Sequence, residues 1–226
     1  VEDLTADTTM LSVLGPLCLG LLEGACAKRL GQLPAYHAVM TSIDGQEVRV
    51  IHRPVGELPA YDLVMSTDSS EQVWQRLVES GLTPVGMEAY QAVRVEQGVP
   101  NYGQEMGELY NPLEAGLIGS IDFAKGCYIG QEVIARLDTY KKVQKYLVML
   151  RFSADATPEE GSTLHQEGKP VGLVTSVARI PTTGVLIGLG YVRTSLAALG
   201  TRLDLVEPAT GSAEIAELPQ LFGPGE

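Results

Sequence analysis

The chain has 226 residues, of which 16 are basic and 28 acidic, so its formal net charge at pH 7 is −12. Hydrophobic residues make up 45% of the chain, which is enough for a core and excludes a protein disordered throughout. A chain this acidic is not expected to hold a nucleic-acid backbone directly or to bind an anionic membrane.

No apolar run reaches the length needed to span a bilayer, and no basic segment precedes an apolar one as in a signal peptide. The three cysteines, Cys18, Cys26 and Cys127, are odd in number and lack the spacing of a disulfide framework. These features indicate a reducing compartment, and we expect the protein in the cytoplasm.

The first third of the sequence mixes strand and helix patterns. Strands are predicted at residues 9–14, 37–43, 47–52 and 59–66. Asp44-Gly45 is a hairpin turn signal between the second and third of these strands. Helices are predicted at residues 17–30 and 68–81, and Asp68 with Glu71 predicts a capping pair for the second helix.

A further helix is predicted over residues 86–97, where Tyr90 and Arg94 are spaced i and i+4 and therefore share a face. That face offers an aromatic plane and a guanidinium, which suits a flat heterocycle that bears carboxylates. The alternative is a Tyr–Arg pair that packs on itself at the surface, and periodicity alone favours it. Residues 101–120 are rich in Asn, Gly and Pro and are predicted to form a loop.

Residues 121–132 place a cysteine between two glycines, directly before an amphipathic helix predicted to start at Gln131. The free N–H groups and the positive dipole end of that helix, with Lys125 nearby, favour the thiolate form of Cys127. Glu132 has the opposite effect, because a carboxylate in the first turn of a helix disfavours the thiolate form of a nearby cysteine. The alternative is that Cys127 is a small hydrophobe that plugs a turn, and the residues alone leave both interpretations open.

From Tyr146 onward, strands alternate with clusters of Gly, Pro, Asp and Ser. They are predicted at residues 146–152, 171–178, 185–192 and 202–206. Gly172, Gly188 and Gly190 suit the bends of a small barrel. The histidines are scattered without partners at ligand spacing, so no metal site is expected.

The octapeptide from Lys125 to Glu132, Lys-Gly-Cys-Tyr-Ile-Gly-Gln-Glu, and the following Ala135-Arg136 resemble the signature of the YgfZ-type folate-binding proteins. These are relatives of the glycine-cleavage T-protein, an aminomethyltransferase. The segment from Arg94 to Pro100 resembles the Arg-x-Glu-x-Gly-x-Pro segment of the same family. Matches extend from about Asp3 to about Leu205, which is nearly the whole chain.

The resemblance implies an α+β fold. A folate-binding domain of mixed strands and helices is expected at residues 1–142, and a small C-terminal β-barrel at residues 143–226. The opening segment, residues 1–16, resembles the middle of the family's folate-binding region. A first portion that family members carry is therefore expected to be missing from this sequence.

The resemblance also implies tetrahydrofolate as the ligand. In the T-proteins the arginine that matches Arg94 helps to bind folate, and an acidic residue in the strand that matches Asp62 holds the pterin. In the YgfZ-type proteins an aromatic residue at the position of Tyr90 contacts folate, although the best-known member has tryptophan there. Glu96, from the same segment as Arg94, is a further candidate for this site.

The preferred function is a YgfZ-type protein that supports the maturation or repair of iron–sulfur enzymes, with Cys127 and Lys125 as the reactive pair. The resemblance implies a link to tRNA modification, and the charge of −12 favours an indirect one. One cysteine cannot hold a cluster alone, so the ligands of an iron–sulfur enzyme, a cluster carrier or a second subunit would be needed.

The alternative is an aminomethyltransferase, in which folate accepts a one-carbon unit from an aminomethyl group on a lipoyl carrier. T-proteins generally lack the cysteine of this motif, which counts against that function. A third hypothesis is a binding or scaffold module with an inert cysteine, and thiol reactivity separates it from the first.

Overall fold

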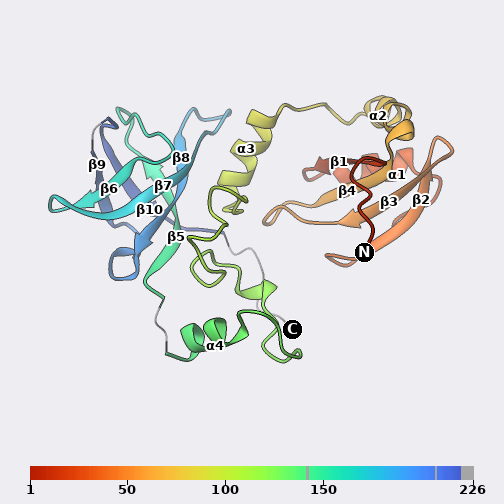
Figure 1. Ribbon diagram of the computed structural model, residues 1–226. Helices are drawn as coiled ribbons and strands as arrows, with labels where there is room; N and C mark the ends of the chain where they lie inside the picture. The colour runs from red at the N-terminus through yellow and green to blue at the C-terminus, as the bar shows by residue number, and fades with distance from the viewer. Residues whose placement is uncertain (141–142, 207, 220–226) are drawn as a thin grey trace. The chain divides into compact units, whose positions relative to one another are not determined.

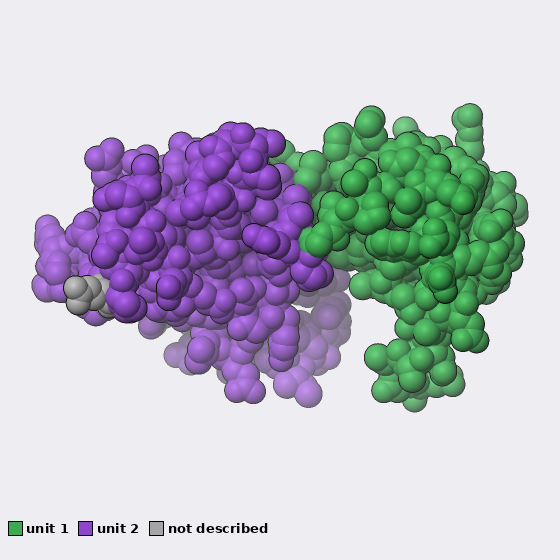
Figure 2. Space-filling view, turned by 90° about the horizontal axis from the view of Figure 1, so that it is seen from above, with its two compact units in different colours: residues 1–86 green, residues 87–226 purple. Residues whose placement is uncertain are grey.

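The computed structural model describes residues 1–140, 143–206 and 208–219 (Figure 1). The chain forms two compact units, residues 1–86 and residues 87–226 (Figure 2). The predicted α+β class is confirmed, with mixed strands and helices first and a closed barrel after them. In the part of the chain that the structure describes, no helix has the length and apolar character to cross a membrane.

The first unit is a four-stranded antiparallel sheet with two helices on one face. The strand order is β1-β4-β3-β2, with β1 at Thr8–Leu14, β2 at Ala38–Ile43, β3 at Gln46–His52 and β4 at Ala60–Ser66. Helices α1 (Cys18–Ala25) and α2 (Ser70–Glu79) contribute Leu22 and Leu77 to the core. Because Leu63 of β4 lies in the same core, alternate residues of β4 point to the other face of the sheet.

The local turn signal between β2 and β3 is confirmed. Asp44 and Gly45 both have positive φ, of 49° and 80°, and Ile43 pairs with Gln46 directly around them. This backbone belongs to the tight turns that match the twist of a hairpin, and Asp-Gly favours it because both residues tolerate positive φ.

Two details of the predicted helices are wrong. Helix α1 ends at Ala25, not near residue 30, because Cys26 becomes extended and forms a bridge with Ile43 at the end of β2. The capping pair of Asp68 is not formed, because the 3-10 turn at Thr67–Ser69 leads into α2 with helical backbone and no side chain caps the helix.

The second unit is organised around a closed six-stranded antiparallel barrel. Its strand order is β10-β5-β8-β7-β6-β9, and the barrel is closed. The strands are β5 (Lys145–Phe152), β6 (Thr163–Gln166), β7 (Lys169–Arg179), β8 (Leu186–Arg193), β9 (Arg202–Leu205) and β10 (Ser212–Ala216). The helices of this unit are α3 (Met87–Glu96) and α4 (Gln131–Tyr140), with 3-10 turns at Ile118–Ser120 and Thr194–Leu196.

Glycines let β7 and β8 approach closely. A Cβ added to Gly188 would lie 2.5 Å from the carbonyl oxygen of Ser176, and one added to Gly190 would lie 2.6 Å from that of Leu173. These glycines therefore remove bulk between neighbouring strands. Helix α3 packs against β7 and β8, and its Val95 shares a core cluster with Leu189.

The predicted boundary between the two domains lies after residue 142. Residues 141–142 are outside the described residues, so this boundary stays a prediction.

Candidate functional site

Arg94 lies inside the second unit, with only 2% of its surface exposed. Each of its five N–H groups has an acceptor within the unit. Nε donates to Gln91 Oε1 (2.8 Å), Nη1 to the carbonyl of Val99 (2.7 Å) and Glu105 Oε2 (3.0 Å), and Nη2 to Gln104 Oε1 (3.2 Å) and Ser176 Oγ (2.8 Å). The guanidinium is therefore fully bonded to the chain's own groups.

The partner of Arg94 is the fully buried carboxylate of Glu105. Besides the arginine, Glu105 Oε2 accepts from the N–H of Asn101 at 2.9 Å and Oε1 accepts from Ser176 Oγ at 2.5 Å. The Tyr191 hydroxyl donates to the carbonyl of Glu105 at 2.7 Å. This cluster ties α3, the loop after it and strands β7 and β8 together.

An aromatic pair lies beside the cluster. The rings of Tyr110 and Tyr191 stack with centroids 3.8 Å apart. Burial raises the pKa of Tyr191, and the neighbouring Tyr110 and the carboxylates of Glu105 and Glu114 raise it further. Tyr191 therefore stays a protonated hydrogen-bond donor well into the alkaline range.

The alternative of a Tyr–Arg pair on the surface is wrong, because Arg94 is buried. Tyr90 is half-buried and Glu96 is exposed at the end of α3. The roles of these three residues in ligand binding stay predictions, and the structure gives Arg94 an additional role as the cation of a buried pair.

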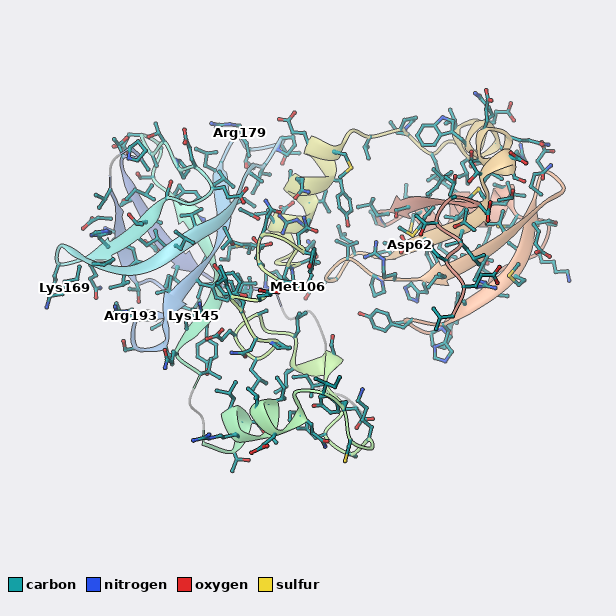
Figure 3. The ribbon with its side chains drawn as sticks, viewed as in Figure 1. Asp62, Met106, Lys145, Lys169, Arg179 and Arg193 are labelled. Carbon is teal, nitrogen blue, oxygen red and sulfur yellow. The ribbon has the colours of Figure 1, made fainter. Side chains whose placement is uncertain are left out.

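Asp62 lies in the middle of the sheet of the first unit (Figure 3). Its side chain points to the face opposite the two helices, yet Asp62 is only 4% exposed. Its carboxylate forms an ion pair with Arg53 and accepts a hydrogen bond from Ser12 Oγ at 2.6 Å. A buried carboxylate held by Ser12 of strand β1 and by a cation has a fixed orientation. The role of Asp62 in folate binding stays a prediction.

Cys127 is an exposed free thiol in the loop that precedes α4. The predicted helix start at Gln131 is confirmed, and Gly130 has a φ of +89°, which favours glycine in the turn before it. Lys125 lies over the ring of Tyr128, with Nζ 4.8 Å from the centroid. The alternative that Cys127 plugs a turn is wrong because its side chain is exposed.

The other two thiols differ from Cys127. Cys18 is buried and Cys26 is half-buried, and burial raises the pKa of both. Among the apolar residues of α4 whose side chains the structure describes, Val133 is exposed, and Ile134 and Leu137 are half-buried.

Sequence reasoning missed Glu105 and Ser176. Glu105 lies in a glycine-rich stretch without periodicity, and no spacing rule pairs it with an arginine eleven residues earlier. Ser176 lies 82 residues after Arg94 in sequence and reaches it only through the barrel. Nothing in the local sequence signals either contact.

Two family models match this chain. The GCVT N-terminal domain matches residues 1–125, and the glycine cleavage T-protein C-terminal barrel domain matches residues 145–219. The chain belongs to the glycine cleavage T-protein family. The second match coincides with the closed barrel of β5 to β10.

Individual proteins with similar sequences support the same family. A chloroplastic protein of Arabidopsis thaliana that bears the name "putative transferase" is 33% identical over 221 residues, which cover 98% of this chain and 50% of that protein. Aminomethyltransferases of Halothermothrix orenii and Thermosynechococcus vestitus are 32% and 29% identical, over 93% and 90% of this chain and 60% and 55% of theirs. The chain thus spans about half the length of the curated relatives it matches.

A solved structure agrees on the fold. The crystal structure of the glycine cleavage system aminomethyltransferase T from Bartonella henselae matches with a TM-score of 0.82, over 95% of this chain and 60% of that one. The sequence identity is 17%, so the likeness concerns the fold alone.

Proposed function

We propose that this member of the glycine cleavage T-protein family binds tetrahydrofolate and acts as a YgfZ-type protein that supports the maturation or repair of iron–sulfur enzymes. The observation that carries the proposal is the exposed free thiol of Cys127, presented in a glycine-bracketed loop before α4. A thiol buried for packing has no access to a client, whereas this one does. Lys125, two residues away in sequence, is the proposed neighbouring cation, and its Nζ lies over the ring of Tyr128.

The partners that fit this role are an iron–sulfur enzyme or a cluster-carrier protein, because one cysteine provides a single ligand. The net charge of −12 supports an indirect link to tRNA modification rather than direct RNA binding. We propose the cytoplasm as the location, in keeping with three cysteines without disulfide spacing.

We propose residues 1–142 as the folate-binding domain, with Asp62, Tyr90, Arg94 and Glu96 as its folate residues. Asp62 supports the proposal through its fixed, buried carboxylate. Arg94 acts as a positioning residue, because its donors hold the segment from Val99 to Glu105. The test is the affinity of the Arg94→Met variant for tetrahydrofolate, measured below the melting temperature of that variant. If the affinity is unchanged, Arg94 does not belong to the site.

Calorimetry tests the folate proposal. Tetrahydrofolate is expected to bind saturably, and Tyr90→Leu is expected to weaken binding by about 0.5–1.5 kcal/mol, the scale of an aromatic stacking contact. Glu96→Gln is compared with Glu88→Gln, since both residues are exposed and lie on α3. Weaker binding for Glu96→Gln alone supports the assignment, and equal affinity of all variants contradicts it.

Aminomethyl transfer is the second candidate, favoured by the names of the relatives from Halothermothrix orenii and Thermosynechococcus vestitus. One-carbon transfer to folate depends on folate placement and polar groups and needs no thiol. Cys127→Ala is therefore expected to leave such an activity unchanged. Two results for Cys127→Ala would together favour the second candidate: unchanged one-carbon transfer to folate, and unchanged rescue of iron–sulfur enzymes.

A further inference from the structure

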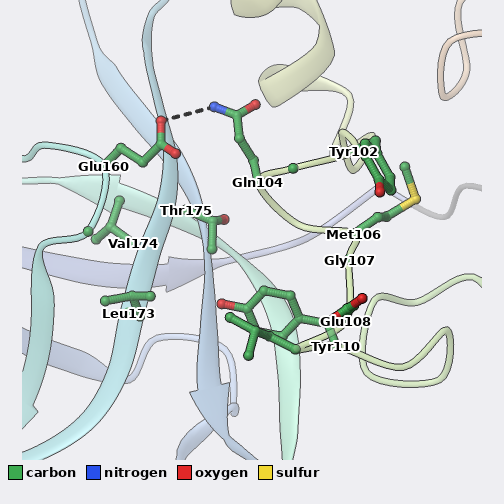
Figure 4. A pocket seen from close by; sticks show the side chains of 13 residues that line it. Tyr102, Gln104, Met106, Gly107, Glu108, Tyr110, Glu160, Leu173, Val174 and Thr175 are labelled. Carbon is green, nitrogen blue, oxygen red and sulfur yellow. Dashed lines mark hydrogen bonds between the residues drawn. The ribbon is translucent and has the colours of Figure 1, made fainter.

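The carboxylates of the described chain differ in their surroundings. Asp62, Glu105 and Glu114 are buried, and of these three only Asp62 belongs to a strand. Glu108 and Glu160 line a cavity of about 350 Å³ in the second unit, but both residues are exposed (Figure 4). Among the described residues, Asp62 is thus the carboxylate that combines burial with a place on one face of a sheet.

The sheet face around Asp62 is not covered by the helices of the first unit. Both helices pack on the opposite face, against Leu63 and its neighbours. The residues paired with Asp62 are Ser12 of β1, which is exposed, and Ile51 of β3, which is half-buried. Val64 lies two residues further along β4 on the same face and is also half-buried. The carboxylate is therefore shielded by side chains and loops of the sheet itself.

Arg53 supplies the part of that shield which touches the carboxylate. Its N–H donates to the carbonyl of Ala60 at 2.9 Å, which extends the pairing of β3 with β4 by one residue and places the Arg53 side chain on the face of Asp62. Nε donates to Oδ2 of Asp62, and Nη2 donates to Oδ1 at 3.2 Å. The Arg53 side chain is 36% exposed and that of Asp62 is 5% exposed, so the guanidinium lies between the carboxylate and the solvent.

The two N–H groups that Arg53 presents to Asp62 form a common chemical pattern. Nε and Nη2 are bonded to one carbon and their N–H bonds run parallel, so that one carboxylate accepts both. A 2-amino-4-oxopyrimidine ring carries the same pattern on one edge, where a ring N–H and an exocyclic NH₂ share a carbon. A carboxylate fits either donor pair, but its two oxygens cannot hold both pairs in the same plane at once.

We propose that Arg53 occupies the position of a ligand, and that a molecule with an aminopyrimidinone edge binds to Asp62 by displacing the guanidinium. This inference rests on the proposed function, because tetrahydrofolate carries that edge. Ser12 Oγ, 2.6 Å from Oδ1, holds the carboxylate when Arg53 leaves, and Ile51 and Val64 offer apolar contact to the ring. Arg53 lowers the affinity of the site, since a site that is open for a fraction of the time binds with that fraction of its intrinsic affinity.

Calorimetry with tetrahydrofolate tests the competition. The variants are Arg53→Ala, which removes the resident donor pair, and Arg49→Ala, which removes an exposed cation from the same face of the sheet. Arg53→Ala is expected to bind tetrahydrofolate at least about tenfold more tightly than the unchanged protein, because a minor open state is typically populated at about 0.1–10%. Arg49→Ala is expected to show no gain. Equal or weaker binding by Arg53→Ala overturns the proposal.

The unchanged protein offers a second measurement that needs no loss of the ion pair. In ¹H–¹⁵N spectra, saturating tetrahydrofolate is expected to shift the Nε–H signal of Arg53 and to speed its exchange with water, because the bond to Asp62 is broken. The Nε–H signal of the exposed Arg49 is the control. An Arg53 signal that stays unchanged in the saturated complex overturns the proposal.

Small probes separate this inference from the folate proposal. Ethylguanidine replaces the missing donor pair, and isocytosine is the bare aminopyrimidinone ring. Both are expected to raise the melting temperature of Arg53→Ala saturably, while Arg49→Ala reports any general effect of the probes on stability. A rise with neither probe, or with ethylguanidine alone, overturns the inference.

The outcomes for the two proposals are distinct. If both probes stabilise Arg53→Ala but tetrahydrofolate binds no variant, the folate proposal fails and the role of Arg53 stands. If tetrahydrofolate binds the unchanged protein at least as tightly as it binds Arg53→Ala, the role of Arg53 fails and the folate proposal stands.

Discussion

Removing the cation of the buried pair should destabilise the second unit strongly. In Arg94→Met the side chain keeps an unbranched apolar stem but loses the guanidinium, so the carboxylate of Glu105, which is 0% exposed, loses its counter-charge. Within the described part of the chain, only the N–H of Asn101 and the hydroxyl of Ser176 remain as its donors. Breaking a buried pair in this way costs about 3–5 kcal/mol, a large part of the roughly 5–15 kcal/mol that stabilises a typical domain.

Glu105→Gln is the second substitution of a double-mutant cycle with Arg94→Met. Because the double variant buries no unpaired charge, its cost should be smaller than the sum of the two single costs by about 0.5–3 kcal/mol, the range for residues in one network. The matched control is Arg202→Met, which breaks the exposed pair with Glu214 in the same barrel. An exposed pair contributes about 0–1 kcal/mol, so this control should leave stability nearly unchanged.

The assay is urea denaturation followed by two signals. Trp74, the only tryptophan of the chain, lies in α2 of the first unit, so its fluorescence reports on that unit. Near-ultraviolet circular dichroism sums the aromatic residues of both units, and seven of the nine tyrosines, including the stacked Tyr110 and Tyr191, lie in the second. The part of its transition that does not follow the fluorescence of Trp74 therefore reports on the second unit. The buried pair does not stabilise the second unit if Arg94→Met lowers the free energy of unfolding no more than Arg202→Met does. The same follows if Arg94→Met shifts only the urea transition followed by Trp74 fluorescence.

Three further predictions concern separate features. Iodoacetamide should label Cys127 in the native protein before the other two cysteines, whose pKa values burial raises; mass spectrometry that finds either of them labelled first contradicts this. Burial raises the pKa of Tyr191 in the folded state above the pKa of about 10 that tyrosine has in the unfolded chain. The stability that Tyr191 contributes is therefore complete below about pH 10 and is lost as the pH rises further. Tyr191→Phe should therefore cost about 0.5–1.5 kcal/mol at pH 7, and its deficit should shrink towards about pH 11 in urea titrations; a constant deficit would exclude the titration. Gly188→Ala should lower the melting temperature because its Cβ meets the carbonyl of Ser176, whereas Gly126→Ala, with open space around it, should not.

Features set by neighbouring residues could be predicted from the sequence. The hairpin at Asp44-Gly45 and the helix start at Gln131 follow from turn chemistry and apolar spacing, and the structure contains both. The barrel was expected from strand patterns and from the resemblance, but β6 and β10 are only four and five residues long and were missed. β9 is as short as β6 but was predicted, because Leu203 and Leu205 alternate with Arg202 and Asp204, whereas β6 has a single apolar residue, Leu164.

Features that depend on distant contacts could not be predicted. The i, i+4 spacing of Tyr90 and Arg94 describes a helix face, but it does not say whether that face meets solvent or a barrel. The structure buries Arg94 against Glu105 and Ser176. The bulge at Thr175 likewise depends on how β7 pairs with β8. Two polar residues between Val174 and Val177 break the alternation, but they do not say which of them is extra or what faces them.

The most direct test of the central proposal is the rescue of iron–sulfur enzymes in cells that lack this protein. The comparison is between the unchanged protein, Cys127→Ala and the neighbouring control Tyr128→Phe. Because Cys127 is exposed, its loss should cost little packing and leave folding and tetrahydrofolate binding nearly intact. The proposal predicts that Cys127→Ala fails to restore iron–sulfur enzyme activity while Tyr128→Phe restores it. Full rescue by Cys127→Ala would contradict the proposed role of the thiol.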